Sequence, residues 1–116
     1  MEFAVSRDGT TLITLHGGSD TTARDDATAE LDDALGALAT DGKITEWAVR
    51  DAEVYEHPTA PFDPYTITLT FSVTVTVEAD EADVAADRGT RRIDDALERA
   101  ELDSVSYTSS PETTAA

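Results

Sequence analysis

The stretch that decides the fold is Tyr65-Thr66-Ile67-Thr68-Leu69-Thr70-Phe71-Ser72-Val73-Thr74-Val75-Thr76-Val77. Its odd-numbered positions are all apolar or aromatic, and its even-numbered positions are all Thr or Ser. Successive side chains of a β-strand point to opposite faces of a sheet, so this alternation predicts a strand with one buried face. At about 3.3 Å per residue the stretch would span roughly 43 Å, about twice the length of an ordinary strand. We expect a sheet to be built around it.

The preceding stretch, residues 44 to 56, is also strand-like and predicts a long antiparallel hairpin with residues 65 to 77. The loop between them, residues 57 to 64, is stiffened by prolines. Pairing Glu56 with Tyr65 would set two apolar pairs on the buried face, Val54 with Ile67 and Ala52 with Leu69.

The alternation changes phase within the first strand of this hairpin. Without an interruption, Trp47 and Val49 would lie on the face that carries the Thr side chains. One extra residue near Arg50-Asp51, a β-bulge, would return both to the buried face. We expect this bulge, with the pairs Val49–Val73 and Trp47–Val75. Were it absent, Trp47 would make the Thr face a candidate interface.

The two ends of the chain predict three short strands. Residues 1 to 16 are interpreted as a two-stranded hairpin that turns at Asp8-Gly9, because Asp-Gly is a strong two-residue turn signal. A last short strand is expected from Leu102 to Thr108. Residues 109 to 116 have little to bury and are interpreted as a disordered tail.

Two stretches have the apolar spacing of helices. Residues 21 to 40 predict one helix, with a Ser or Asp of the preceding turn as its N-cap. A second helix is expected after the acidic residues 78 to 81 and up to about Ala100. Gly89 lies in its apolar stripe and indicates a close approach to the sheet or a local kink.

The predicted order is therefore β-β-α-β-β-α-β. We expect an α+β fold with an antiparallel-rich sheet and two helices packed on one face. The element order is that of a ferredoxin-like split sandwich with an extra N-terminal strand. The chain of 116 residues suits a single domain, residues 1 to 108.

The charge balance is the most specific compositional feature. The chain has 25 acidic and 8 basic side chains, a formal net charge of -17, and Lys43 is its only lysine. Repulsion between so many carboxylates weakens a compact state in dilute buffer and is screened at molar salt. We interpret the composition as adaptation to high salt, as in halophilic proteins. An acidic nucleic-acid mimic or a tail for basic partners would concentrate its charge in blocks, whereas here it is spread along the chain.

The same composition excludes or opposes several classes of function. The chain has no Cys, which excludes disulfides, thiolate metal sites and Cys nucleophiles. Its net charge opposes binding to nucleic acid. No apolar run approaches the roughly 20 residues of a membrane span, and the start lacks a signal-peptide pattern. We expect a soluble cytoplasmic protein that binds neither nucleic acid nor membrane, with no cofactor and no metal.

The best local candidate for chemistry is His16-Gly17-Gly18-Ser19, which leaves a strand and enters a helix. Free backbone N–H groups and the helix dipole at such a place can hold an anion. The motif lacks the glycine spacing of nucleotide-binding loops, so a structural turn with an N-cap is the other interpretation. His16 and His57 would form a metal or acid/base set with Asp63 only if the 57–64 loop folded back; we expect isolated surface histidines.

Four of the eight cations lie on the second predicted helix: Arg88, Arg91, Arg92 and Arg99. Arg88, Arg92 and Arg99 share a side with Asp95, which favours structural ion pairs. The alternative is a contact for an acidic ligand or partner, with Arg88 and Arg92 as candidate binding residues.

The leading hypothesis is a non-enzymatic module that self-associates, as a dimer, or binds a protein partner through the long hairpin. Such a hairpin exceeds what the chain can cover, and exposed strand edges invite pairing. Trp47, Phe62 and Tyr65 are the candidate interface residues. The alternative is a small-molecule or anion-binding protein, or a small enzyme, that uses the turn at residues 16 to 19.

Overall fold

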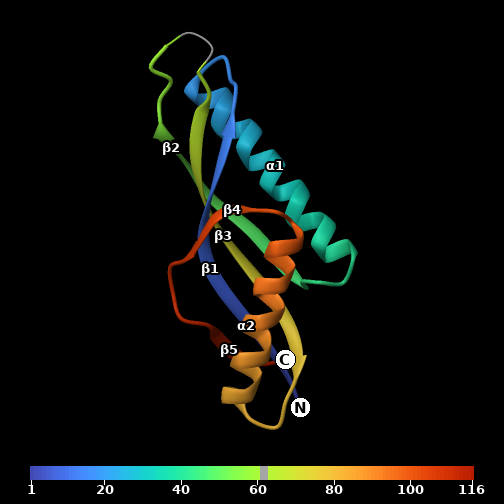
Figure 1. Ribbon diagram of the computed structural model, residues 1–116. Coiled ribbons are helices and arrows are strands. Elements are labelled where there is room, and N and C mark those ends of the chain that lie inside the picture. Colours follow the sequence, from blue (N-terminus) through green and yellow to red (C-terminus); the bar gives the residue numbers. More distant parts are fainter. Residues whose placement is uncertain (61–62) are drawn as a thin grey trace.

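The computed structural model describes residues 1–60 and 63–116 (Figure 1). The elements follow in the order β1 (Glu2–Leu15), α1 (Asp20–Thr40), β2 (Glu46–Glu56), β3 (Tyr65–Glu78), α2 (Ala82–Arg99), β4 (Asp103–Tyr107) and β5 (Glu112–Ala115). The molecule is elongated, with extents of 56 × 25 × 19 Å. The C-terminal end of β2 lies at one end of the long axis, and both chain termini lie at the other (Figure 1).

The strands form one antiparallel sheet in the order β2-β3-β1-β4, and β5 also pairs with β1. β1 and β2 are therefore parallel to each other, with β3 inserted between them and α1 connecting them. In the same way β3 and β4 flank β1 and are connected by α2. This is the split βαβ arrangement of a ferredoxin-like fold. The predicted α+β class, with its antiparallel sheet and two helices, is confirmed.

The predicted turn at Asp8-Gly9 is wrong, because β1 is one continuous strand that pairs with β3 along its whole length. Asp8 lies opposite Ser72, and the Ser72 hydroxyl donates to the Asp8 carboxylate at 2.6 Å. Gly9 lies opposite Phe71, and a Cβ there would come within 3.0 Å of the main-chain oxygen of Ser106 in β4. The glycine allows the close approach of β4, and the long partner strand β3 holds β1 extended.

The predicted disordered tail is also wrong, because it contains β5. β4 leaves β1 near Gly9, and β5 pairs with the remaining edge of β1 from Phe3 to Ser6. The additional strand of this fold is therefore at the C-terminus, and the predicted extra N-terminal strand is absent. The cause is the vacant edge of β1, whose unpaired backbone groups a short terminal segment can satisfy.

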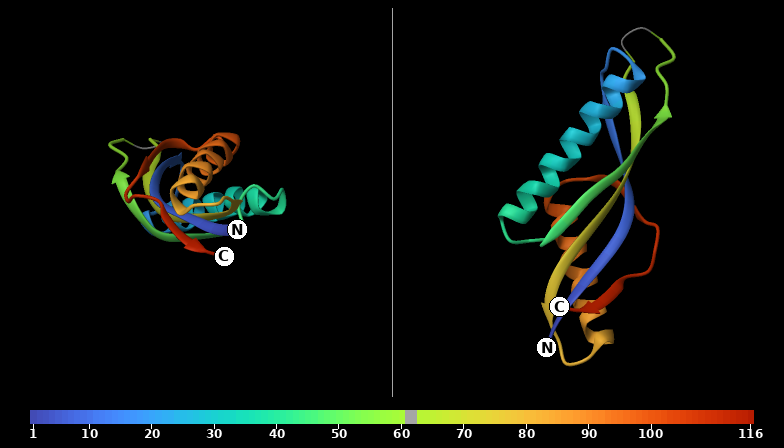
Figure 2. Two further views of the ribbon diagram at one scale, coloured as in Figure 1. Left: turned by 90° about the horizontal axis from the view of Figure 1, so that it is seen from below. Right: turned by 180° about the vertical axis from the view of Figure 1, so that it is seen from behind.

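The core lies between the helices and one face of the sheet. The odd-numbered residues of β3 from Ile67 to Val77 are all buried, and its Thr and Ser side chains are half-buried on the opposite face. α1 covers the half of the sheet near the end of β2, and α2 covers the half near the termini (Figure 2). A Cβ at Gly89 would lie 2.4 Å from the Val5 Cβ, so the predicted close approach of this glycine is confirmed.

The predicted bulge is confirmed by a register shift between Val49 and Asp51. Val54 pairs with Ile67 and Ala52 with Leu69, as predicted, but the predicted pair Glu56–Tyr65 is wrong, because a second register shift after Val54 places Glu56 opposite Thr66. Beyond the bulge the partners differ by two residues from those predicted: Val49 pairs with Phe71 and Trp47 with Val73. The extra residue lies on β2, between Val49 and Asp51. The residues of β2 before it therefore pair with residues of β3 that lie two positions closer to the β2–β3 loop than predicted. Trp47 still lies on the helix-covered face, so the Thr face gains no aromatic side chain.

Among the described residues, neither helix combines the length and the apolar character that a membrane span requires.

Candidate functional site

The longest unpaired edge of the sheet belongs to β2. This strand of 11 residues pairs with β3 on one side, and no described residue pairs with its other side. The opposite border of the sheet is built from β4 and β5, with five and four residues. A strand at a sheet edge presents a row of unpaired N–H and C=O groups. β2 therefore offers the longer template for another strand.

The inner face of β2 carries a row of apolar side chains that α1 covers only in part. The row consists of Trp47, Val49, Ala52 and Val54, and we call it the β2 row. Trp47 is 37% exposed, and the other three are half-buried. In a core that includes many fully buried residues, this row is the incompletely covered margin.

Trp47 is held by α1. Its indole Nε1 donates to the Asp32 carboxylate at 3.0 Å. The indole ring lies beside Gly36, where a Cβ would be 3.5 Å from the nearest ring carbon. The ring thus has a fixed position at the border between α1 and the free edge of β2.

The bulge places two opposite charges side by side on the outer face of β2. The Asp51 carboxylate accepts the N–H of Ala52 at 2.9 Å, which stabilises the irregular backbone. Arg50 Nε donates to the Ser72 hydroxyl at 2.6 Å, and that hydroxyl donates in turn to Asp8. Both side chains are exposed. The middle of the free edge therefore carries one cation followed by one anion.

No protein-family model matches the sequence, and no curated protein matches it.

The turn at residues 16 to 19 has a structural use. Ser19 is the N-cap of α1, and its hydroxyl accepts the N–H of Thr22 at 3.2 Å. Gly17 lies against Ala23, and a Cβ there would come within 3.0 Å of the Ala23 Cβ. His16 and Gly18 are exposed. These contacts account for the Ser and the first Gly as cap and close-packing residues.

His57 is not isolated, which differs from the expectation of isolated surface histidines. Its Nε2 lies 3.2 Å from Asp20 Oδ2, and its ring meets the Tyr65 ring edge-on with centroids 6.5 Å apart. Burial and a hydrogen bond with Asp20 raise the pKa of Tyr65. Asp63, which would complete a metal set with the two histidines, instead accepts hydrogen bonds from Thr59 and from the N–H of Ala60. The described residues contain no group of three side chains arranged to hold a metal.

Arg88 and Arg92 donate to main-chain carbonyl groups of β3. Arg88 Nη1 lies 2.6 Å from the oxygen of Glu78, and Arg92 Nη1 lies 2.7 Å from that of Thr76. β2 begins opposite Thr74, so this last part of β3 has no strand neighbour on that side among the described residues. Within the described chain no Lys or Arg side chain lies within 4.0 Å of a carboxylate oxygen. The ion pairs with Asp95 that the spacing favoured are absent from the described residues, and Arg88 and Arg92 bind free carbonyl groups instead.

The three predicted interface residues lie in different places. Trp47 belongs to the β2 row, and Tyr65 begins β3 beside His57. Phe62 is outside the described residues. Sequence reasoning missed the pair Arg50 and Asp51 as charged residues of the free edge, although the predicted bulge was the signal that could have pointed to them.

Proposed function

We propose that the protein is a self-associating module that forms a two-fold dimer through antiparallel pairing of two β2 strands. The observation that supports this most strongly is the free edge of β2, with the incompletely covered β2 row beside it. Addition of a strand satisfies the unpaired backbone groups, and the second copy covers the apolar margin. A two-fold interface uses the same patch on both copies, so β2 must be complementary to itself.

One register of β2 against itself meets this requirement. In it, Arg50 of each copy lies opposite Asp51 of the second copy. The bulge makes the rest consistent, because inward-facing residues then oppose inward-facing ones: Val49 with Ala52 and Trp47 with Val54. On the outer face Ala48 lies opposite Glu53, and nowhere do like charges oppose one another. Opposite charges across a strand pair stabilise it, and like charges destabilise it.

The neighbouring registers either place like charges opposite each other or pair outward-facing with inward-facing residues. A shift of one residue places Asp51 opposite Asp51 of the second copy, or Arg50 opposite Arg50. A shift of two residues places an outward-facing bulge residue opposite an inward-facing one, such as Asp51 opposite Ala52. The symmetric register is therefore specified by the bulge and by the charge pair within it.

Paired substitutions at Ala48 test the register, because this exposed side chain makes no hydrogen bond of its own. A48K places an ammonium opposite Glu53 of the second copy, twice per dimer, and A48E places a carboxylate there. We expect the dimer dissociation constant of A48E to exceed that of A48K by about tenfold, since each cross-strand charge pair contributes roughly 0.2–1 kcal/mol. Sedimentation equilibrium in molar KCl gives both constants.

The matched controls are A82K and A82E, at an exposed alanine in the first turn of α2. They change the net charge equally but lie away from β2. A wild-type monomer at every concentration, or equal effects at positions 48 and 82, would overturn the proposal. The single tryptophan provides a second readout, because the emission of Trp47 should shift to shorter wavelength as the dimer buries it.

We also propose that the module works in a salt-rich cytoplasm. The charge of -17 supports this setting, because two such copies associate readily only where ions screen their repulsion.

A further inference from the structure

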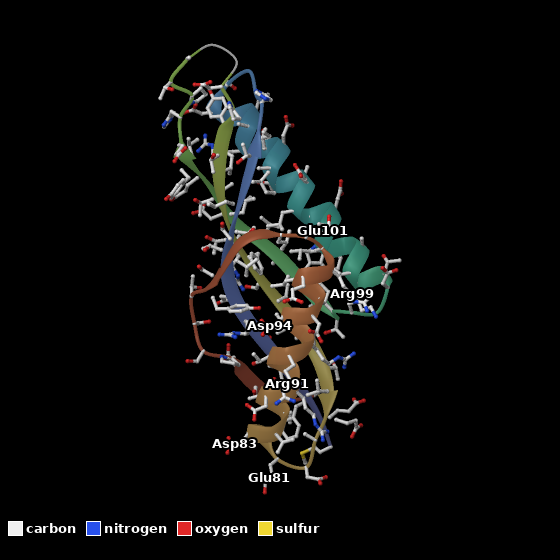
Figure 3. All side chains as sticks on the ribbon, in the orientation of Figure 1. Glu81, Asp83, Arg91, Asp94, Arg99 and Glu101 are labelled. Atoms are coloured by element: carbon white, nitrogen blue, oxygen red, sulfur yellow. The ribbon has the colours of Figure 1, made fainter. Side chains whose placement is uncertain are left out.

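The second feature with a potential for binding is a concentration of cations between the C-terminal ends of the two helices. Two pockets adjoin there and share Lys43 and Arg99. The smaller, of about 180 Å³, is also lined by Arg92 and Asp95. The larger, of about 420 Å³, is also lined by Asp41 and by the apolar side chains Ala34, Leu38 and Ala100. Figure 3 shows Arg99 on the side of α2 that faces α1.

These cations have no carboxylate partner. The chain carries three acidic side chains for every basic one, yet none lies within 4.0 Å of Lys43, Arg92 or Arg99 in the described residues. Lys43, the only lysine, is half-buried and its ammonium makes no hydrogen bond there. An ammonium without a partner at the border of a partly apolar pocket can form a charge-assisted hydrogen bond with a bound anion. The C-terminal ends of both helices also favour cations here, since Arg99 lies in the last turn of α2 and Lys43 lies two residues beyond the C-cap of α1.

The positions of the lining residues locate the charged and apolar parts of a ligand. Lys43 and Arg99 border both pockets, whereas Asp95 borders only the smaller and Asp41 only the larger. Arg92 is anchored by its bond to the Thr76 carbonyl, which fixes the guanidinium at the edge of the smaller pocket. Lys43 and Arg99 therefore place two positive charges where the pockets meet, and an apolar surface begins on one side of them.

We propose that these pockets bind a small organic anion. Its carboxylate or phosphate group lies between Lys43 and Arg99, and its apolar part lies on Leu38, Ala34 and Ala100. Arginine suits such groups because its fork of N–H donors can bind two oxygens at once. The larger pocket has the size of small-molecule sites, which run from about 300 to 1,000 Å³. This site is independent of the β2 edge and of the turn at residues 16 to 19.

The test is a ligand titration in which the backbone amide shifts are monitored by NMR. It is done at the lowest KCl concentration at which the protein stays folded. The probes are hexanoate, hexyl phosphate and, as a cation with the same apolar chain, hexylammonium. We expect saturable shifts of the amides of Lys43 and Arg99 with an anionic probe. The stronger of the two anions identifies the head group, and either one supports the site.

Three glutamine variants separate a site from a general attraction of anions. K43Q and R99Q should weaken binding at least tenfold, and K43R should restore most of it. R91Q removes the same charge from an exposed position of α2 that lines neither pocket, and should leave binding unchanged. Equal losses in R91Q and R99Q, equal binding of hexylammonium, or no saturable shift with either anion would each overturn the proposal.

Discussion

At the scale of single residues, two helix glycines have opposite environments. Gly36 of α1 leaves room beside Trp47 for a Cβ at 3.5 Å, an ordinary van der Waals contact. Gly89 of α2 leaves none, because a Cβ would come within 2.4 Å of Val5. Gly36 lowers helix stability by about 1 kcal/mol relative to alanine, although the packing has room for an alanine. At Gly89 the packing requires a glycine.

Alanine substitutions at the two positions should therefore act in opposite directions. G36A should raise the free energy of unfolding by about 0.5–1 kcal/mol through helix propensity. G89A should lower it by about 1–3 kcal/mol, because α2 must move away from β1. Urea unfolding in molar KCl measures both. A stabilising G89A would mean that α2 does not pack against Val5 as described.

Gly9 shows that a local sequence signal for a turn can be overridden by strand pairing elsewhere in the fold. The Asp8-Gly9 pair predicts a turn on local grounds, but β3 supplies a partner for every residue of β1 and holds it extended. The close approach at Gly89 is predictable because the apolar stripe of a helix faces the sheet, and a glycine within that stripe brings the two backbones together. The role of Gly9 depends instead on β4, which lies about a hundred residues later in the chain.

At the scale of elements, β4 is tied to α2 and β1 through Tyr107. The Tyr107 hydroxyl donates to the Asp94 carboxylate, and the Arg7 guanidinium stacks on the Tyr107 ring at 3.7 Å from its centroid. Arg7 also donates to the main-chain oxygen of Ser109, at the beginning of the connection to β5. Burial, together with the hydrogen bond to Asp94, raises the pKa of Tyr107 well above its ordinary value.

This raised pKa predicts a loss of stability in alkali. The neutral phenol is favoured in the folded state, so its contribution is complete below the pKa of about 10 of an unfolded tyrosine and is lost as the pH rises above it. Y107F should therefore unfold more easily near neutral pH and show a shallower decline above about pH 10 than the wild type. Thermal melts across this pH range test it, and parallel declines would contradict it.

The hairpin and its bulge could be predicted from sequence, and the short strands could not. In β3 and β2 the positions of the apolar side chains indicate which face is buried, so the shift of their alternation by one residue near Arg50 predicted the bulge. The residues of β5, Glu112–Ala115, have no such alternation of apolar side chains. The position of β5 depends instead on where β4 leaves the edge of β1. The partners of Arg88 and Arg92 depend likewise on where β2 begins opposite β3.

At the scale of the whole molecule, the excess of negative charge determines how stability responds to salt. The described Lys and Arg side chains form no ion pairs with carboxylates, so salt has few attractive pairs to weaken and many repulsive ones to screen. We predict that the melting temperature rises from dilute buffer to molar KCl. Sucrose, which carries no charge, serves as the control and should raise it less. A melting temperature that stays flat or falls with KCl would contradict salt adaptation.

The central claim is the two-fold register of β2, and disulfide trapping tests it most directly because the chain has no native Cys. In the double variant A48C/E53C, each cysteine of one copy lies opposite the other cysteine of the second copy. Cross-strand Cα atoms lie about 4.5–5.5 Å apart, within disulfide range, whereas positions 48 and 53 of one copy are about 16 Å apart. Mild oxidation in molar KCl should convert the double variant to a covalent dimer, and A48C or E53C alone should remain monomeric on a non-reducing gel. A double variant that stays monomeric, or an A48C variant that links to itself equally fast, would contradict the register.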